Sequence, residues 1–334
     1  MNLTIVIRLS ALGDTAILLP ALYSAARRYP GEQFVLVTKT QFAPIFINRP
    51  PNLQIEGIDV RGGHAGFRGL MRFIARLKKI AKGYEKIRIA DMHGLPRSRA
   101  ISLAFWLKGA KTAAIDKGRI DKWRLTRRRN KILKPLKTSL QRYCEVFAKI
   151  GLPTEITFDR LFPEKPKTDE IRIGIAPFAR HPGKTWKPDK MEKLLQMLTK
   201  SGDKRIFLFG SGAEAPQLAA WSLKYAGVES LAGAGLSFPE ELEIINSLSL
   251  LVGMDSGNMH LASLCGVPVV SIWGATHPFA GFYGFRQAKS NAVQTDLPCR
   301  PCSVFGNKPC FRGDYACLNT ISPEKVLEKI NEIL

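Results

Sequence analysis

Short apolar runs alternate with amphipathic stretches along most of the chain. The first run, residues 3–9, is rich in β-branched residues and leads through a glycine-containing turn into a helical pattern at 16–29, which Pro30-Gly31 ends. A strand, a turn and a helix in this order open an α/β unit. The same alternation continues through the first half of the chain. It predicts strands at 33–38, 54–58 and 86–91, and helices at 42–47, 67–81, 98–107 and 140–150.

A second alternation follows residues 161–169, which have the composition of an interdomain linker. It predicts strands at 171–176, 204–209, 250–253 and 267–272, and helices at 188–200, 214–226, 239–247 and 258–265. Ser322, with Pro323 after it, is predicted to cap a final helix. We therefore expect two Rossmann-like domains. Their expected bounds are 1–160 and 170–318, with a C-terminal helix in 319–334. Because ligands bind at the C-terminal ends of such strands, a substrate is expected in the cleft between the domains.

Length and charge narrow the function classes. The 334 residues suit two domains, and no apolar stretch approaches the roughly 20 residues that span a bilayer. The first residues carry no basic leader, so we expect a soluble cytoplasmic protein. The net charge is +22, and residues 61–137 alone hold 23 Lys or Arg against four acidic residues. The electrostatic field of this positive charge favours an anionic partner such as nucleic acid, acidic lipid or a phosphorylated glycan. The alternative is that the charge only keeps the protein soluble.

One carboxylate follows the first predicted strand. Gly13 lets the backbone turn tightly, and Asp14 then lies near the start of the next helix. There it could take a proton from a sugar hydroxyl as a general base, or it could only cap the helix. The turn has no G-x-G-x-x-G pattern, which argues against a nicotinamide dehydrogenase.

Three strand ends in the second half carry groups suited to a nucleotide diphosphate. Arg180 and Lys184 follow the strand at 171–176 and could pair with phosphate oxygens, while Glu214 follows 204–209 and could bind ribose hydroxyls. The turn Asp255-Ser256-Gly257 follows 250–253 and opens a helix, so its free N–H groups could hold an anion. His260 lies one turn further on. Taken singly, these residues also fit a solvated lysine, helix caps and a packing histidine.

Four of the six cysteines lie close together near the C-terminus. They are Cys299, Cys302, Cys310 and Cys317, a spacing that a structural zinc site or a redox pair could use. The distance between the last two is longer than in the usual C-x-x-C partner. The sequence has no H-E-x-x-H motif and no D-x-D pair after a strand, so no catalytic metal is predicted.

As a set, these motifs resemble glycosyltransferase family 9, the ADP-heptose:lipopolysaccharide heptosyltransferases. The resemblance is carried by Ile7-Arg8-Leu9-Ser10-Ala11-Leu12-Gly13-Asp14, Lys184-Thr185-Trp186, Gly212-Ala213-Glu214, Gly253-Met254-Asp255-Ser256-Gly257-Asn258-Met259-His260-Leu261-Ala262 and Gly266-Val267-Pro268-Val269-Val270. It implies two facing Rossmann domains, the GT-B architecture. It also implies an inverting transfer of heptose from ADP-heptose to the lipopolysaccharide inner core without a metal or other cofactor.

The resemblance also implies roles for the candidate residues. Asp14 would be the general base, Lys184 would neutralise the diphosphate, and Glu214 would bind the ribose. Asp255, Gly257 and His260 would line the donor site, together with the helix N-terminus near Ser256. Arg180 lies where the chain departs from the family, and its phosphate contact is expected from the residue itself. The chain departs from the family pattern at Phe178-Ala179-Arg180 and at Asn258-Met259, which leaves the donor sugar open.

The basic segment suits an inner-core acceptor that carries carboxylates and phosphates. The candidate acceptor-binding residues are Arg61, Arg97, Arg124 and Arg142. The same charge would hold the enzyme peripherally at the cytoplasmic leaflet. The alternatives are a relative that uses another nucleotide sugar or acceptor and, more remotely, a non-enzymatic binder of anionic glycans or nucleic acid. Nucleic acid is not an expected partner, because only Trp106 and Trp123 accompany the basic residues.

Overall fold

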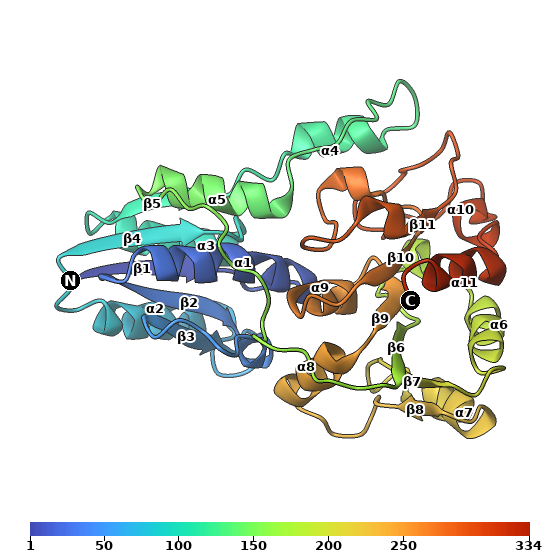
Figure 1. Cartoon of the computed structure of the whole chain (residues 1–334). Coiled ribbons are helices and arrows are strands. Elements are labelled where there is room, and N and C mark those ends of the chain that lie inside the picture. The colour runs from blue at the N-terminus through green and yellow to red at the C-terminus, as the bar shows by residue number, and fades with distance from the viewer. The chain divides into compact units, whose positions relative to one another are not determined.

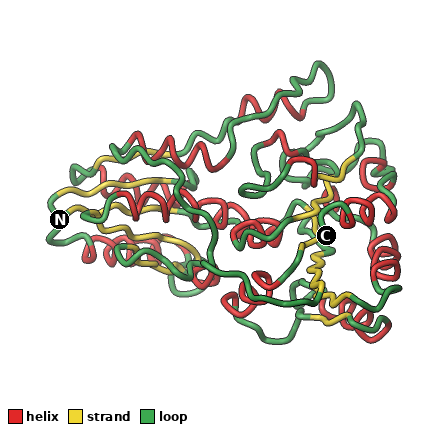
Figure 2. Tube along the Cα trace, viewed as in Figure 1, coloured by secondary structure: helices red, strands yellow, loops and turns green.

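All 334 residues are described by the computed structural model, in which the chain divides into two compact units. The first unit comprises Met1–Lys117 and Ser139–Asp159, and the second comprises Gly118–Thr138 and Arg160–Leu334. Each unit holds one parallel β-sheet covered by helices, as Figure 1 and the strands in Figure 2 show. The predicted fold class, α/β with two Rossmann-like units, is confirmed.

The sheet of the first unit has five parallel strands in the order β3-β2-β1-β4-β5. Its strands are β1 (Asn2–Ile7), β2 (Glu32–Lys39), β3 (Leu53–Ile58), β4 (Lys86–Asp91) and β5 (Lys111–Ala114). Its helices are α1 (Leu12–Arg28), α2 (Gly66–Ile80), α3 (Pro96–Trp106) and α5 (Ser139–Lys149), with a 3-10 turn η1 at Thr40–Ile45. Apolar side chains of α2 and α3 share a core with one face of the sheet. Helices α1 and α5 pack together, and Phe34 on β2 meets Phe147 on α5 edge to face.

The second unit holds six parallel strands in the order β11-β10-β9-β6-β7-β8. They are β6 (Ile171–Ala176), β7 (Lys204–Leu208), β8 (Val228–Ser230), β9 (Leu250–Met254), β10 (Val269–Trp273) and β11 (Ala292–Gln294). Every residue of β9 and β10 is buried, as expected for central strands of a parallel sheet covered on both faces.

The helices of the second unit complete these layers. They are α4 (Arg119–Thr126), α6 (Pro188–Leu198), α7 (Ala215–Lys224), α8 (Phe238–Ser247), α9 (Gly257–Leu264), α10 (Ala316–Asn319) and α11 (Pro323–Asn331), with 3-10 turns η2 (Pro182–Lys184), η3 (Pro278–Ala280) and η4 (Lys289–Asn291). Helices α6, α7 and α11 share one apolar core with the sheet, and α8 packs on α9. No helix combines the length and apolar character needed to cross a membrane.

The unit boundaries differ from the predicted domain bounds in two places. Residues 118–138 were expected within a first domain of 1–160, but they group with the second unit. One reason is Lys131, whose Nζ donates to the carbonyl oxygens of Cys299 and, at 2.7 Å, of Pro301. The predicted separate C-terminal helix, α11, belongs to the core of the second unit, where Val326 and Ile330 are fully buried.

Three short strands and two short helices, α4 and α10, were not predicted from the sequence. Strands β5, β8 and β11 have four, three and three residues and lie at sheet edges, so only pairing with a neighbour defines them. Helix α4 lies in a basic stretch that was expected to be loop-rich. Only Leu125 and Thr126 of its eight residues are buried, which leaves little apolar periodicity to detect.

Candidate functional site

Asp14, Lys184 and Asp255 follow strands at which the strand order reverses. In the first unit these are β1 and β4, which are neighbours with Ile7 opposite Asp91. In the second unit they are β6 and β9, with Ala176 opposite Gly253. The strand order of the second unit is that of a full Rossmann sheet, and the first unit lacks only the sixth strand. Ligands of doubly wound sheets bind at this switch point, at the carboxyl ends of the strands.

Asp14 occupies the third position of α1, directly beyond the end of β1. Its Oδ2 accepts a 3.4 Å hydrogen bond from the Ala11 N–H, so the helix-capping interpretation holds in part. The same oxygen forms an ion pair with Arg8, a buried residue whose Nη1 also donates to the Met92 carbonyl at 2.6 Å. Oδ1 makes neither contact, and the Asp14 side chain is 26% exposed. One carboxylate oxygen therefore remains to accept a proton.

A buried tyrosine supports this ion pair from α5. The Arg8 guanidinium lies 5.9 Å from the centre of the Tyr143 ring, and the Tyr143 hydroxyl donates to the Asp14 carbonyl at 3.2 Å. Burial raises the pKa of Tyr143, so the hydroxyl stays protonated and can act as this donor. The orientation of Asp14 is thus fixed from three sides: by its own turn, by β1 and by α5.

His93, at the end of β4, was not predicted as a site residue. Asp91 holds the turn that places it, because its Oδ1 accepts from the N–H groups of His93 at 2.9 Å and Gly94 at 2.7 Å. His93 is 6% exposed, and its Nδ1 has no hydrogen-bond partner. Burial, then the nearby positive charges of Arg8 and Lys117, lowers the pKa of His93 to about 4, so the ring is neutral at pH 7. The sequence feature that could have identified His93 as a site residue is its position just after a central strand.

Lys184 and Asp255 join the two strand ends at the switch point of the second unit. Lys184 Nζ lies 2.7 Å from Asp255 Oδ2 and donates to the Asp255 carbonyl at 3.0 Å. The Asp255 side chain is 4% exposed and that of Lys184 is 15% exposed. Asp255 therefore positions the lysine and does not itself face an anion, while the partly exposed ammonium remains able to reach one.

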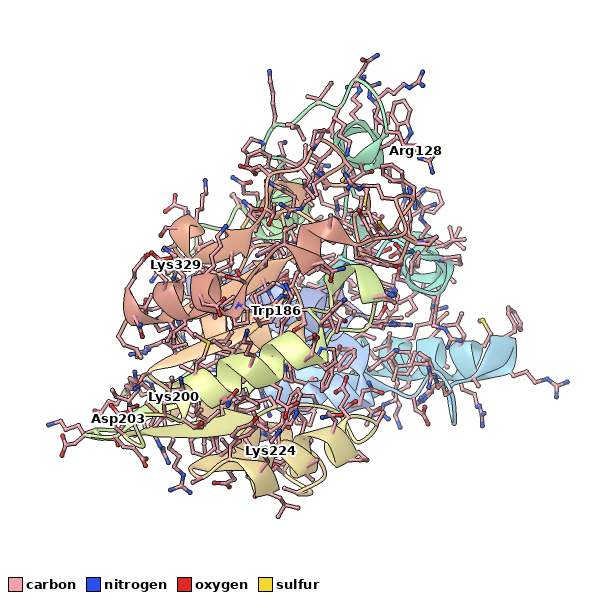
Figure 3. The ribbon with its side chains drawn as sticks, turned by 90° about the vertical axis from the view of Figure 1, so that its right-hand side faces the viewer. Arg128, Trp186, Lys200, Asp203, Lys224 and Lys329 are labelled. Carbon is pink, nitrogen blue, oxygen red and sulfur yellow. The ribbon has the colours of Figure 1, made fainter.

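The loop that carries Lys184 is held by a buried aromatic side chain. Trp186 is fully buried, and its indole N–H donates to the Ile321 carbonyl at 3.3 Å; Figure 3 shows it in the interior of the unit. The Thr185 hydroxyl lies within hydrogen-bonding distance of the Ala179 and His181 carbonyls, at 3.1 and 3.2 Å. The Lys184-Thr185-Trp186 motif thus combines one functional side chain with two that fix its loop.

Glycines allow three loops to approach one another around Lys184. A Cβ on Gly183 would lie 2.7 Å from the Gly306 carbonyl oxygen, and one on Gly274 would lie 2.6 Å from the Gly183 carbonyl oxygen. Gly306 has a positive φ of 72°, and a Cβ there would lie 2.6 Å from Cγ of Lys184. The Ala275 N–H donates to the Gly183 carbonyl at 2.8 Å. The lysine is therefore packed as well as paired.

The N-terminus of α9 lies directly after Asp255. Ser256 is the N-cap residue in an extended conformation, and its side chain caps no backbone N–H. Gly257 opens the helix, so the first-turn N–H groups lack an intrahelical partner and are oriented towards an anion. His260 is buried on the same helix at 6% exposure. The predicted anion turn and Lys184 therefore belong to one end of the sheet.

The remaining donor candidates lie on neighbouring loops. Glu214 is the N-cap residue of α7, and its Oε2 accepts from the Ser211 N–H at 2.6 Å and the Ser211 hydroxyl at 2.9 Å. This carboxylate shapes the turn after β7 and keeps Oε1 for another donor. Arg180 is exposed on the loop after β6.

The four predicted acceptor arginines are not gathered into one site. Arg61 is exposed after β3, and Arg97 Nη1 donates to the His64 carbonyl at 2.6 Å. Arg124 belongs to the second unit, where it lies 3.7 Å from Asp121. Arg142 is 5% exposed and donates to the Asp116 carbonyl at 2.9 Å, so its guanidinium is already engaged. Arg61 and Arg97 follow β3 and β4 in the chain and remain acceptor candidates in the first unit.

All six cysteines are free thiols, including the four near the C-terminus. Burial raises the pKa of Cys302, and it raises the pKa of Cys317 to about 11. The structure holds no cluster of three or more His, Cys, Asp or Glu side chains arranged to bind a metal ion.

Comparison with known proteins gives a consistent picture. Residues 74–309 match the family described as glycosyltransferase family 9 (heptosyltransferase). The chain is 25% identical to lipopolysaccharide heptosyltransferase 1 of Pseudomonas aeruginosa, over 99% of this chain and 97% of that protein. Among solved structures, a glycosyl transferase family 9 protein of Veillonella parvula has a TM-score of 0.75 at 18% identity, covering 99% of this chain and 96% of that one. The E. coli heptosyltransferase WaaC with ADP has a TM-score of 0.69 at 20% identity, covering 100% of both chains.

The structural neighbours are too distant in sequence to show more than the fold, but the family match spans most of the chain. It includes the switch point of the second unit with Lys184 and Asp255. The chain belongs to glycosyltransferase family 9, the heptosyltransferases.

Proposed function

We propose that this protein transfers heptose from ADP-heptose to a hydroxyl of the lipopolysaccharide inner core, with inversion at the anomeric carbon. The observation that carries the proposal is Lys184, held by Asp255 next to the uncapped N-terminus of α9 in a family 9 chain. An ammonium and helix N–H groups at one strand edge suit the diphosphate of ADP. The Pseudomonas aeruginosa relative named above is a lipopolysaccharide heptosyltransferase, which supports the sugar and the acceptor.

In the proposed mechanism the second unit binds the donor. Lys184 and the first turn of α9 hold the diphosphate, Arg180 adds a contact to a phosphate oxygen, and Glu214 Oε1 binds a ribose hydroxyl. As the bond from the anomeric carbon to the phosphate oxygen breaks, negative charge grows on ADP. Lys184 and the helix N–H groups are already in place to stabilise that charge. His260 completes the donor site as a residue at the end of the first turn.

The first unit activates the acceptor. Asp14 Oδ1 takes the proton of the attacking hydroxyl as that oxygen forms its bond to the anomeric carbon. Arg8 and the Ala11 N–H hold the carboxylate in a fixed orientation, and the Tyr143 hydroxyl holds the backbone carbonyl of the same residue. Lys39 and Lys117 lie close enough to lower the pKa of His93, which indicates a positive strand edge suited to an acceptor bearing carboxylates.

We further propose that the basic segment 61–137 holds the enzyme at the cytoplasmic face of the membrane, where the acceptor is made. The excess of positive charge in this segment suits the anionic leaflet. A family relative that uses another nucleotide sugar is the alternative, because Phe178-Ala179-Arg180 departs from the common family pattern.

The test is mass spectrometry of an inner-core acceptor incubated with ADP-heptose and a panel of other nucleotide sugars. Asp14→Asn keeps the side-chain shape but removes the base, so we expect the transfer rate to fall roughly 10²- to 10⁴-fold with unchanged ADP binding. Asp169→Asn, on the exposed linker, is the matched control and is expected to be as active as the wild type. Full activity in Asp14→Asn would refute the base, and transfer from a different donor alone would favour the alternative.

A further inference from the structure

A cationic pocket lies in the second unit and is lined by residues other than the donor candidates described above. It has a volume of about 230 Å³. Its walls are residues 118–138 around α4, here called the α4 segment, and residues 299–311, here called the cysteine loop. Four of its lining residues are cations, namely Arg127, Arg128, Lys131 and Lys308, and none is acidic. Both walls belong to the same unit, so the pocket is a local feature of that fold.

Two aromatic rings hold the arginines at the pocket. The Arg127 guanidinium lies 5.3 Å from the centre of the Trp123 ring, and that of Arg128 lies 4.8 Å from the centre of the Phe311 ring. Stacking on a ring leaves the edge of a guanidinium, which carries its N–H donors, free to bind an anion. Figure 3 shows Arg128 at the periphery of the unit, on the α4 segment.

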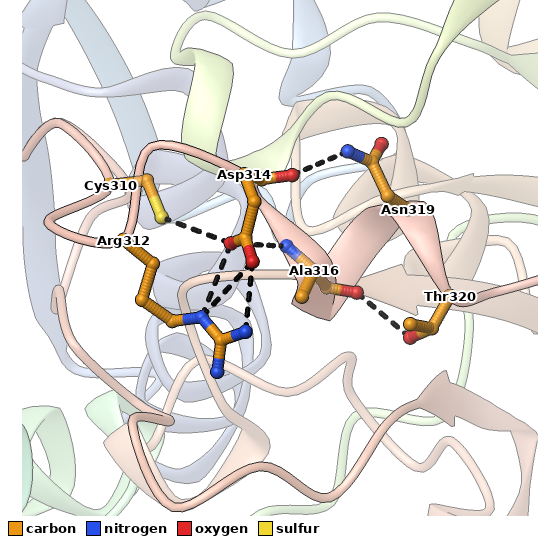
Figure 4. A network of polar contacts seen from close by, with 6 residues as sticks. All are labelled: Cys310, Arg312, Asp314, Ala316, Asn319 and Thr320. Atoms are coloured by element: carbon orange, nitrogen blue, oxygen red, sulfur yellow. Dashed lines mark hydrogen bonds and ion pairs between the residues drawn. The ribbon is translucent and has the colours of Figure 1, made fainter.

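Positive charge in the pocket is not neutralised by the nearby acids. Arg128 and Lys308 are exposed and form no ion pair. Asp314, which follows the cysteine loop, is already occupied: it pairs with Arg312 at 2.8 Å and accepts from the Ala316 N–H at 3.1 Å (Figure 4). Asp121 lies nearest Arg124. The pocket therefore presents at least two cations, Arg128 and Lys308, that lack an acidic partner.

Lys131 connects the two walls of the pocket, so its ammonium is not available to bind a ligand. Its ammonium donates to the carbonyl oxygens of Cys299 and Pro301, and burial lowers its pKa. This contact fixes the distance between the α4 segment and the cysteine loop, so the cations of the pocket are positioned before any ligand arrives.

Exposed apolar side chains lie in the pocket lining and elsewhere on the two segments that form it. Ile120 and Trp123 on α4 are 66% and 60% exposed, Leu133 is 55% exposed, and Phe305 and Phe311 on the opposite wall are 52% and 49% exposed. A free phosphate needs only the cations. Cations flanked by exposed aromatic and aliphatic side chains match a membrane interface, where rings lie at the level of the headgroups.

We propose that this pocket binds the phosphate of an anionic lipid headgroup at a membrane surface, with Arg128 and Lys308 as the ligands and Trp123 as an interfacial anchor. The inference rests on the proposed action at a membrane, and it adds a specific site on the second unit to the general attraction of the basic segment. The pocket uses none of the donor-site residues, although its cysteine loop also packs on Lys184 through Gly306, so we assign it to attachment rather than to sugar transfer.

The test measures binding of the full chain to vesicles of phosphatidylcholine with and without phosphatidylglycerol, by cosedimentation. We expect binding only to the anionic vesicles, and a loss of at least roughly tenfold in Arg128→Glu/Lys308→Glu. The matched control is Lys193→Glu/Lys200→Glu, which changes the net charge equally at exposed positions on and just after α6. Trp123→Ser should weaken binding without changing the charge.

Two results would overturn the pocket assignment. One is an equal loss in both double variants, which would mean that only net charge matters. The other is complete release of the protein by inorganic phosphate at constant ionic strength, which would identify a free anion as the ligand. Transfer to a lipid-free acceptor should be unchanged in Arg128→Glu/Lys308→Glu. The transfer assay separates two failures. If the proposed transferase activity is wrong, transfer will be absent in the wild type and in every variant, whereas if only the pocket assignment is wrong, transfer will be present and vesicle binding will not depend on Arg128 and Lys308.

Discussion

Two aspartates that look alike in the sequence have different surroundings in the fold. Asp14 and Asp255 each follow a strand and precede a helix, so the pattern alone predicts a cap or a site for both. Asp14 keeps one oxygen free, whereas Asp255 is buried and committed to Lys184. The sequence could predict both positions because strand ends are local features. It could not predict the Lys184–Asp255 pair, because the two residues are 71 positions apart in the sequence. They meet only because β6 and β9 are neighbours in the sheet.

The two roles of Lys184, structural and functional, can be separated. In Lys184→Ala the buried Asp255 loses its cation, and we expect the free energy of unfolding to fall by about 3 kcal/mol. In Lys184→Ala/Asp255→Ala no buried charge is left without a partner, so most of that stability should return. ADP affinity should stay low in both, because the ammonium is absent from both. Urea unfolding and calorimetric titration with ADP measure the two effects, and wild-type stability in the single variant would contradict the pairing.

At the scale of elements, the loops after β6 and β10 and the cysteine loop form one packed assembly around Lys184. The longer helices and the central strands were predictable because their apolar residues recur over long, regular stretches. The irregular stretch between β10 and α11 offers no such period, so its packing against Gly183 was not predictable from the sequence. His93 was missed for a related reason: its environment is created by charges from several strand ends.

Gly306 tests this packing. In Gly306→Ala the new Cβ would meet Lys184 Cγ, and the backbone would keep its positive φ. We expect roughly 1 kcal/mol of strain from the φ angle, plus a displaced lysine and a measurable loss of ADP affinity. Gly313→Ala is the matched control, since Gly313 has a φ of 78° but open space around its Cβ position. It should lose similar backbone stability and keep ADP binding, so an equal loss of affinity in both variants would count against the steric mechanism.

At the scale of the whole molecule, the same strand order is used twice, once for each proposed substrate. The alternation of strands and helices was sufficient to predict this duplication. It was not sufficient to assign residues 118–138, because membership of a unit depends on contacts such as that of Lys131 with the cysteine loop. Each unit also contains one histidine that is strongly disfavoured in its charged form: His93 in the first and His277 in the second.

These histidines predict how stability depends on pH. Burial, followed by the positive charge of Arg300, lowers the pKa of His277 to about 4, and its Nδ1 accepts from the Phe279 N–H at 3.1 Å. The folded-state pKa values lie below the usual 6.5, so the unfolded chain binds protons first as the pH falls. The stabilising contribution is complete above pH 6.5 and is lost progressively towards pH 4.

As the pH falls from 7 to 5, we expect each histidine to lower the free energy of unfolding by up to roughly 2 kcal/mol. The effect of His277 should be smaller, because His277 is more exposed. Chemical denaturation at a series of pH values measures this slope. His93→Gln keeps a polar side chain that does not titrate, so part of the slope should disappear. A slope that is identical in His93→Gln and the wild type would show that His93 does not contribute.

The route of the chain has a consequence for the order in which the protein is made. The polypeptide passes from one unit to the other at residues 117–118, 138–139 and 159–160. During synthesis the α4 segment leaves the ribosome more than 160 residues before Cys299 and Pro301, the partners of Lys131. The first unit can complete its sheet early, while the basic α4 segment remains without its partner loop until almost the whole chain has emerged. A gene fragment that begins at residue 160 would encode all six strands of the second sheet but would lack one wall of the cationic pocket.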